Sequence, residues 1–224
     1  MKLLLAVANL QDIEPALAHY GVTPLVSTTP YLFTTSILQH EVTICQTGVG
    51  VYQTTYKITR ALTAQKYHLA LKMSLGTSYK AEYSIGAALN IVNEKPGDFG
   101  TLINYEWKDH YDFELMKRDE APHVRGGFVN LTNAYMNVFM PFKKAVGLTV
   151  NHYGDKAQVE NRLAKYKADC ETGDGLGFVY PCLFEKQNFY HLCVIERNLV
   201  SGDENFAAAQ QKLNDVLIDL LEKI

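Results

Sequence analysis

Cysteine is scarce in this 224-residue sequence, and none of its four cysteines belongs to the close pairs that zinc and redox motifs require. Three of them lie in apolar runs that are typical of buried strands or helices. A chain of this length buries enough apolar surface to fold without disulfide bonds. We therefore expect reduced core cysteines, as in a cytoplasmic protein. They are Cys45, Cys170, Cys182 and Cys193.

Long apolar runs are also missing, and none approaches the length of a membrane span. The N-terminal MKLLLAVANLQ superficially resembles a secretory signal, because Lys2 precedes apolar residues and the small-residue stretch Ala6-Val7-Ala8. Only residues 3–5 precede that stretch, whereas a signal peptide needs roughly 7 to 15 apolar residues there. The sequence therefore predicts neither a signal peptide nor a membrane helix.

The sequence lacks a strong excess of one charge. Lysine and arginine total 21 against 24 acidic residues, which gives a net charge of −3, and the basic residues are evenly scattered. This distribution excludes the basic stripe that is typical of nucleic-acid-binding proteins. The seven histidines stand singly, so neither a metal site nor a cofactor is expected.

No internal repeat, low-complexity tract or flexible linker divides the chain, which predicts a single domain over residues 1–224. Apolar runs rich in β-branched residues alternate with helical patterns, as in α/β folds with helices on both faces of a sheet. Strands are expected near 2–8, 41–47, 68–73, 87–93, 100–106, 145–150, 168–171 and 189–196. Helices are expected near 11–19, 51–66, 156–167, 174–186 and 203–223. The irregular, aromatic segment 97–141 is expected to be an excursion from the sheet.

Ligands of such folds bind at the carboxyl ends of strands. The first strand is followed by Asp12, which is either a catalytic acid or a helix N-terminal acid favoured by the macrodipole. The second leads to Gly48 and Gly50. These glycines form either a tight turn or a weak phosphate cradle, because the third glycine of a dinucleotide fingerprint is missing.

Three later stretches carry further candidates. The sequence Lys72-Met73-Ser74-Leu75-Gly76-Thr77-Ser78 ends a buried strand and is compatible with a substrate loop or with a simple turn. The stretch ADCETGDGLGFVYPCL at 168–183 places Asp174 between two glycines, where a strand gives way to a helix. Pro181 predicts a kink or break in that helix. The last strand ends in Arg197-Asn198.

The order of these motifs resembles the nucleoside phosphorylase and nucleosidase superfamily, and most closely the futalosine hydrolases of menaquinone biosynthesis. MKLLLAVANLQDI is similar to that family's opening strand and catalytic acid, and TGVGVYQTTYKITRAL to its T-G-V-G turn and helix. HLALKMSLGTSYKAEYSIGAALNIV and VGLTVN resemble its third strand and its G-x-T-V-N strand. CETGDGLGFVYPCL and VIERNLV take the places of E-S-M-E-G-A-A-x-x-Y-x-C-L and R-A-I-S-N-x-V. The resemblance implies a three-layer α/β/α fold with a central mixed, twisted sheet.

The resemblance also implies hydrolysis of the N-glycosidic bond of a purine nucleoside derivative, with hypoxanthine released from futalosine. Asp12 falls on the acid that activates water, Asp174 on the ribose ligand and Asn198 on the residue that hydrogen-bonds purine N7. Further implied substrate-binding residues are Gly48, Gly50, Ser74, Gly76, Ser78, Gly173 and Phe178. Relatives assemble as homodimers or larger homo-oligomers. The aromatic run expected to form an interface or a substrate wall is Tyr105, Trp107, Tyr111 and Phe113.

Several positions depart from the family's pattern. Asp12 and Asp174 stand where the family usually has glutamate, so each carboxylate is one methylene shorter. Gly173 replaces a methionine, Arg197 replaces a serine, and Lys72 stands where many phosphorylases carry an anion-binding arginine. Two alternatives to the hydrolase therefore stay open. One is a catalytically impaired relative that binds a nucleoside-like ligand or acts as an interaction protein, and the other is a phosphate-dependent phosphorylase.

Arg197 is a possible modifier of the pocket, as is Lys72. An Arg197 side chain paired with Asp12 or Asp174 would exclude substrate and favour the impaired relative.

Overall fold

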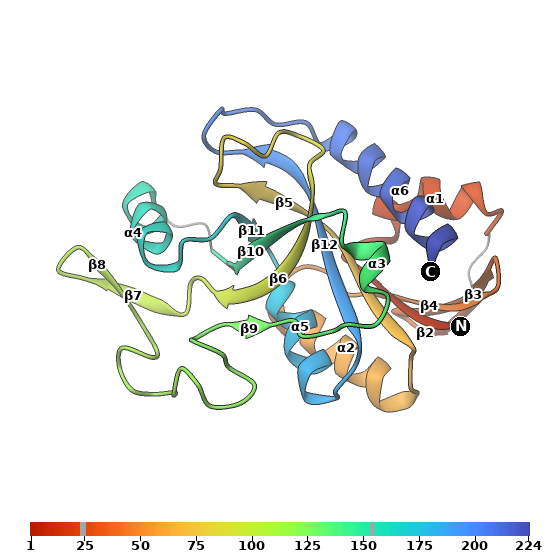
Figure 1. Ribbon diagram of the computed structural model, residues 1–224, viewed down its shortest axis with the longest axis horizontal. Helices are drawn as coiled ribbons and strands as arrows, with labels where there is room; N and C mark the ends of the chain where they lie inside the picture. Colours follow the sequence, from red (N-terminus) through yellow and green to blue (C-terminus); the bar gives the residue numbers. More distant parts are fainter. Residues whose placement is uncertain (23–25, 153–154) are drawn as a thin grey trace.

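The computed structural model describes residues 1–22, 26–152 and 155–224. Within these residues a ten-stranded mixed sheet forms the centre of the molecule, with the strand order β11-β10-β6-β12-β5-β1-β4-β3-β2 and β9 paired with β6 (Figure 1). Its strands are β1 (Lys2–Val7), β2 (Val26–Thr29), β3 (Leu32–Ile37), β4 (His40–Gln46), β5 (Leu69–Ser78), β6 (Ala88–Pro96), β9 (Phe128–Val129), β10 (Lys143–Thr149), β11 (Cys170–Thr172) and β12 (Phe189–Asn198). A separate hairpin consists of β7 (Gly100–Ile103) and β8 (Glu106–Asp109).

Helices cover both faces of the sheet. The 3-10 helix η1 (Leu10–Ile13), α1 (Glu14–His19) and α6 (Phe206–Lys223) lie on one face, and α2 (Val51–Ala64) and α5 (Gly175–Phe184) on the other (Figure 1). The shorter α3 (Met136–Phe139) contributes Phe139 to the core on the α6 face, and α4 (Lys156–Tyr166) packs Tyr166 against Trp107 of β8. Among the described residues, no helix combines the length and hydropathy needed to cross a membrane.

The side chains of β1 show how one apolar strand supports both layers. Leu3 and Leu5 pack into the core that α6 completes, whereas Leu4 and Ala6 pack into the core shared with α2 and α5. This alternation is the ordinary two-residue period of a strand, and burial of both sides explains why the strand reads as a continuous apolar run. The predicted three-layer fold is therefore confirmed.

Parallel pairing brings several strand ends to one edge of the sheet. Strand β1 lies parallel to both β4 and β5, and β12 lies parallel to β5. The carboxyl ends of these four strands therefore point in the same direction. The residues that follow or end them, from Asp12 to Asn198, are candidates for a common site.

The expected strands and helices of the central layers are present, with shifted ends. The sequence does not predict the strands at the edges of the molecule correctly. The strand expected at 100–106 is split by a turn into β7 and β8. Strands β2 and β3 form an edge hairpin rich in threonine, so they lack the unbroken apolar run used to find the other strands. Helix α5 continues through Pro181 and ends at Phe184, so the expected break is absent.

Candidate active site

A cavity of about 230 Å³ lies at this edge of the sheet. It collects residues from the ends of β1, β4, β5, β11 and β12 and from the start of α6. All four glycines and both aspartates expected at the site line it. The lining residues are Ala8, Asn9, Asp12, Gly48, Val49, Gly50, Ser74, Leu75, Gly76, Thr77, Glu171, Gly173, Asp174, Glu196 and Phe206.

Asp12 is held in η1 by contacts from two directions. Its carboxylate Oδ2 accepts a hydrogen bond from the Asn9 backbone N–H at 3.1 Å. From α6, Asn214 donates through Nδ2 to the Asp12 backbone oxygen at 2.9 Å, and its Oδ1 accepts from the Ala16 N–H at 2.9 Å. Burial raises the pKa of Asp12, against a smaller opposing effect of that backbone hydrogen bond. Asp12 is thus a fixed, partly desolvated carboxyl group at the cavity wall.

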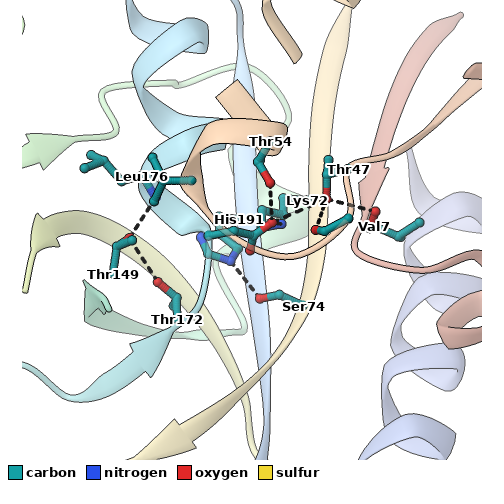
Figure 2. A network of polar contacts seen from close by, with 12 residues as sticks. Val7, Thr47, Thr54, Lys72, Ser74, Thr149, Thr172, Leu176 and His191 are labelled. Atoms are coloured by element: carbon teal, nitrogen blue, oxygen red, sulfur yellow. Dashed lines mark hydrogen bonds and ion pairs between the residues drawn. The ribbon is translucent and has the colours of Figure 1, made fainter. Parts of the chain in front are cut away.

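Asp174 is the second carboxylate at the cavity, and three donors reach its Oδ2 atom. The Lys72 ammonium lies at 2.8 Å, the Thr54 hydroxyl at 2.8 Å and the Thr47 hydroxyl at 3.3 Å (Figure 2). The Lys72 side chain is 0% exposed. Burial alone raises the pKa of Asp174, but the charge and hydrogen bond of Lys72, together with the Thr54 hydrogen bond and the His191 ring, bring that pKa below its usual value. Asp174 is therefore ionised, with Oδ1 as the oxygen available to a ligand.

The glycines around Asp174 are explained by close packing. A Cβ atom at Gly175 would lie 2.5 Å from Oε2 of the buried Glu94, and one at Gly177 would lie 2.9 Å from the Val51 carbonyl oxygen of α2. A Cβ atom at Gly173 would meet no atom within 4 Å, because this residue faces the cavity. Two of the three glycines thus let α5 approach its neighbours closely, and the third leaves space beside the carboxylate.

Two acidic residues that sequence reasoning missed, Glu171 and Glu196, also line the cavity. Glu196 enters it where the register of β12 against β5 shifts, between Ile195 and Arg197. Burial raises the pKa of Glu196, and the negative charges of Glu204 and Asp12 raise it further. Burial also raises the pKa of Glu171, although the Tyr79 hydroxyl donates to its carboxylate and opposes the effect. Glu196 could be identified as a cavity residue only from the register shift, and no local residue type predicts that shift.

No protein-family model matches the chain, and no curated protein matches it in sequence. Solved structures do match its fold. A 5′-methylthioadenosine/S-adenosyl homocysteine nucleosidase from Campylobacter jejuni aligns with a TM-score of 0.80 and 14% sequence identity over 100% of both chains. The futalosine hydrolase of Helicobacter pylori strain 26695 aligns with a TM-score of 0.79 and 15% identity, covering 100% of this chain and 98% of the other.

The chain has the nucleoside phosphorylase fold. Several residues that the sequence resemblance places at the site nevertheless lie outside the cavity. Asn198 does not line the cavity, because its side chain is used by nearby loops. Its Nδ2 donates to the carbonyl oxygens of Lys80 and Tyr83, and its Oδ1 accepts from the N–H groups of Val200 and Ser201.

Ser78 and Phe178 are also absent from the cavity lining. The Ser78 hydroxyl donates to the Lys80 carbonyl oxygen at 2.9 Å, and the Phe178 ring is fully buried between α5 and the sheet. The sequence resemblance indicates these positions only by their order along the chain. Their side chains face the interior of this nucleoside phosphorylase fold, because the strand and helix periods at those positions turn them away from the cavity.

Of the two expected pocket modifiers, Lys72 contacts an aspartate of the cavity and Arg197 does not. Arg197 is 49% exposed, and its Nε lies 3.8 Å from Glu204 Oε2, so it turns away from both aspartates. Lys72 instead pairs with Asp174 from beneath the cavity. The pocket is thus not closed by arginine, but one of its carboxylates already has a cationic partner.

The aromatic run has two parts. Trp107 and Tyr111 are buried within the excursion, whereas Tyr105 and Phe113 are exposed. A second cavity, of about 360 Å³, lies between this excursion and helices α2 and α5. Its aromatic and histidine lining consists of Tyr52, Phe99, His110, His123, Phe128 and Tyr180. The described residues contain no group of three or more His, Cys, Asp or Glu that could hold a metal ion.

Proposed function

We propose that this chain is a nucleosidase that hydrolyses the N-glycosidic bond of a purine nucleoside derivative. One observation carries the proposal: the carboxyl groups of Asp12, Asp174 and Glu196 line one cavity at the carboxyl ends of four parallel strands. The nucleosidase fold of the neighbours supports the same class of reaction.

The chemistry requires opposite charges to be stabilised on the two sides of the breaking bond. Positive charge develops on the ribose ring and negative charge on the leaving base. We assign the general base that activates water to Asp12, because its raised pKa makes it a better proton acceptor than an exposed aspartate. The general acid for the base is Glu196, whose raised pKa favours the protonated form.

Asp174 is assigned to the ribose hydroxyl groups. Its Oδ2 is occupied by Lys72, Thr54 and Thr47, which leaves Oδ1 to accept from the sugar. Gly173, Gly48 and Gly50 leave room for the ring to approach the backbone. The substrate we propose is futalosine, with hypoxanthine as the released base, and the aromatic second cavity is the proposed site of the substrate tail.

A base-release assay tests the proposal directly. Purified protein is incubated with futalosine, aminofutalosine, methylthioadenosine, S-adenosylhomocysteine and inosine, each with and without phosphate. Release of base from one of them, independent of phosphate, is the expected result. No release from any nucleoside by a folded protein would contradict the nucleosidase proposal.

A specific observation favours one alternative, a relative that binds a nucleoside without cleaving it. The buried ion pair with Lys72 neutralises much of the negative charge of Asp174, which leaves this carboxylate less able to stabilise positive charge on the ribose ring. Isothermal titration calorimetry with the same nucleosides separates this alternative from the hydrolase, since it gives binding without turnover. Release that requires phosphate would instead indicate a phosphorylase that uses Lys72.

We also propose that the chain forms a homodimer. Exposed aromatic residues gather on α2 and α5, which pack against each other next to the second cavity. This α2/α5 face consists of Tyr52, Tyr56, Tyr180 and Phe184. Exposed apolar patches often mark interaction sites, and aromatic residues are enriched in the buried parts of protein interfaces.

A further inference from the structure

A serine, a histidine and a glutamate form a chain of contacts beneath the cavity. The Ser74 hydroxyl lies 2.8 Å from Nε2 of His191 (Figure 2). Nδ1 of the same ring lies 3.6 Å from Oε2 of Glu94. His191 and Glu94 are fully buried, whereas Ser74 is partly exposed and lines the cavity. The three residues come from neighbouring strands β5, β12 and β6.

The glutamate is held firmly in place. Its Oε1 accepts hydrogen bonds from the Thr172 hydroxyl at 2.5 Å and the Thr149 hydroxyl at 2.6 Å. Its Oε2 packs where Gly147 and Gly175 leave room, since a Cβ atom at either residue would lie within 2.6 Å of it. Among the described residues, Glu94 Oε2 and His191 Nδ1 have no hydrogen-bond partner. They lie 3.6 Å apart, so a small movement of either side chain would make each the partner of the other.

This arrangement favours one tautomer of His191. A proton on Nδ1 faces the Glu94 carboxylate, which leaves Nε2 as the acceptor for the Ser74 hydroxyl. A nucleophile within hydrogen-bond distance of a base, with the base oriented by a carboxylate, is the arrangement that activates serine in hydrolases.

We propose that Ser74, His191 and Glu94 form a nucleophilic triad, and that the cavity accepts small carboxylic esters as substrates of a second activity. His191 Nε2 takes the hydroxyl proton as Ser74 Oγ attacks the ester carbonyl carbon. The ester C–O bond breaks, and the alcohol leaves with that proton. Water then attacks the acyl carbon and gives a proton to His191. The acid departs, and the proton returns to Ser74. The sum is ester plus water giving acid plus alcohol.

A fluorophosphonate, which phosphonylates activated serines, tests the proposal without any nucleoside. The wild-type protein is incubated with the probe, and the adduct is located by mass spectrometry of proteolytic peptides. A single adduct on Ser74 is expected, together with a stoichiometric burst of nitrophenolate from 4-nitrophenyl acetate. Because labelling reads Ser74 itself, its outcome is independent of the base-release assay.

Variants identify the source of the reactivity. Ser74→Ala removes the adduct, whereas Ser84→Ala, which changes an exposed serine outside the cavity, leaves the labelling rate unchanged. His191→Gln lowers the rate about 100-fold or more, because the base is lost. Glu94→Gln also lowers it, and serves if His191→Gln does not fold. An unlabelled Ser74 in the folded wild type, or labelling of a folded His191→Gln or Glu94→Gln variant at the wild-type rate, overturns the proposal.

Discussion

Lys72 and Asp174 form an ion pair from which water is almost excluded, with side-chain exposures of 0% and 9%. A buried pair of this kind adds little over a well-packed apolar pair, because both charges lose their hydration. Removing one partner has a much larger effect, since the other charge stays buried without compensation. The pair therefore sets both the charge state of the cavity and the tolerance of the fold to substitution.

We expect Lys72→Met to lower the free energy of unfolding by about 3–5 kcal/mol. The double variant Lys72→Met/Asp174→Leu should recover much of that loss, because no charge is left unpaired. Urea unfolding of both variants measures the difference. The matched control is Lys2→Met, which breaks the half-exposed pair with Glu41 and should cost at most about 1 kcal/mol. A loss in Lys72→Met no larger than in Lys2→Met would contradict the assignment of a buried pair.

The same pair predicts how stability depends on pH. The pKa of Asp174 is lower in the folded protein than in the unfolded chain. Its contribution is thus complete above the unfolded pKa of about 3.9 and is lost as the pH falls through the folded pKa. Urea unfolding at about pH 5 and about pH 3 should therefore show a steeper acid loss in the wild type than in the Lys72→Met/Asp174→Leu variant. Equal losses would show that Asp174 does not gain charge stabilisation on folding.

Asp12 and Glu196 predict the pH profile of base release. Both pKa values are raised, so activity should fall on the acid side as Asp12 becomes protonated and on the alkaline side as Glu196 loses its proton. Glu196→Gln should lower kcat about 10²–10⁴-fold and abolish the alkaline limb. Asp12→Asn should abolish turnover while nucleoside binding persists. An unchanged profile in Glu196→Gln would remove that residue from the mechanism.

At the scale of elements, helix α5 links the buried contacts around Asp174 with those around Glu94. Its N-cap is Asp174, its first residue Gly175 packs on Glu94, and Gly177 lies against Val51 and Thr54 of α2. Thr54 in turn donates to Asp174. A change in the distance between α2 and α5 is therefore transmitted to the Asp174 carboxylate.

We expect Gly177→Ala to destabilise the protein by about 1–3 kcal/mol, because its Cβ would lie 2.9 Å from the Val51 oxygen and from Thr54 Cβ. Gly173→Ala is the matched control, since its Cβ meets no atom within 4 Å, and it should change stability by at most about 0.5 kcal/mol. Thermal unfolding of both variants measures the effect. Equal midpoints would show that the contact between α2 and α5 accommodates a Cβ atom at Gly177.

The sequence predicts strands and helices well where one face or both faces are buried. It predicts poorly which side chains face the cavity where this depends on pairing with a neighbouring strand. Strand β1 is identified by its apolar run, and the cavity by Asp12 and Asp174 at the strand ends. Asn198 and Glu196 are the counterexample. A register shift in β12 brings Glu196 into the cavity and leaves Asn198 to the loops, and this shift follows from pairing with β5, not from local residue types.

At the scale of the whole molecule, the α2/α5 face predicts a homodimer. Tyr52 is 89% exposed, Tyr56 61% and Phe184 56%, which is unusual for aromatic residues on one surface. Size-exclusion chromatography with light scattering should give a dimer mass for the wild type and a monomer mass for Tyr52→Glu/Phe184→Glu. Leu131→Glu changes a residue elsewhere whose exposure, 74%, lies between those of Tyr52 and Phe184, and this variant should remain a dimer. A monomeric wild type at micromolar concentration would contradict the proposed interface.

Asn214 has a consequence for fragments of this protein. It joins α6 to the backbone of Asp12 and Ala16 across 202 and 198 positions of sequence, and Phe206 of the same helix lines the cavity. A proteolytic cut that releases α6 therefore removes one wall of the cavity and the support of the Asp12 backbone, although every strand of the sheet is left in place.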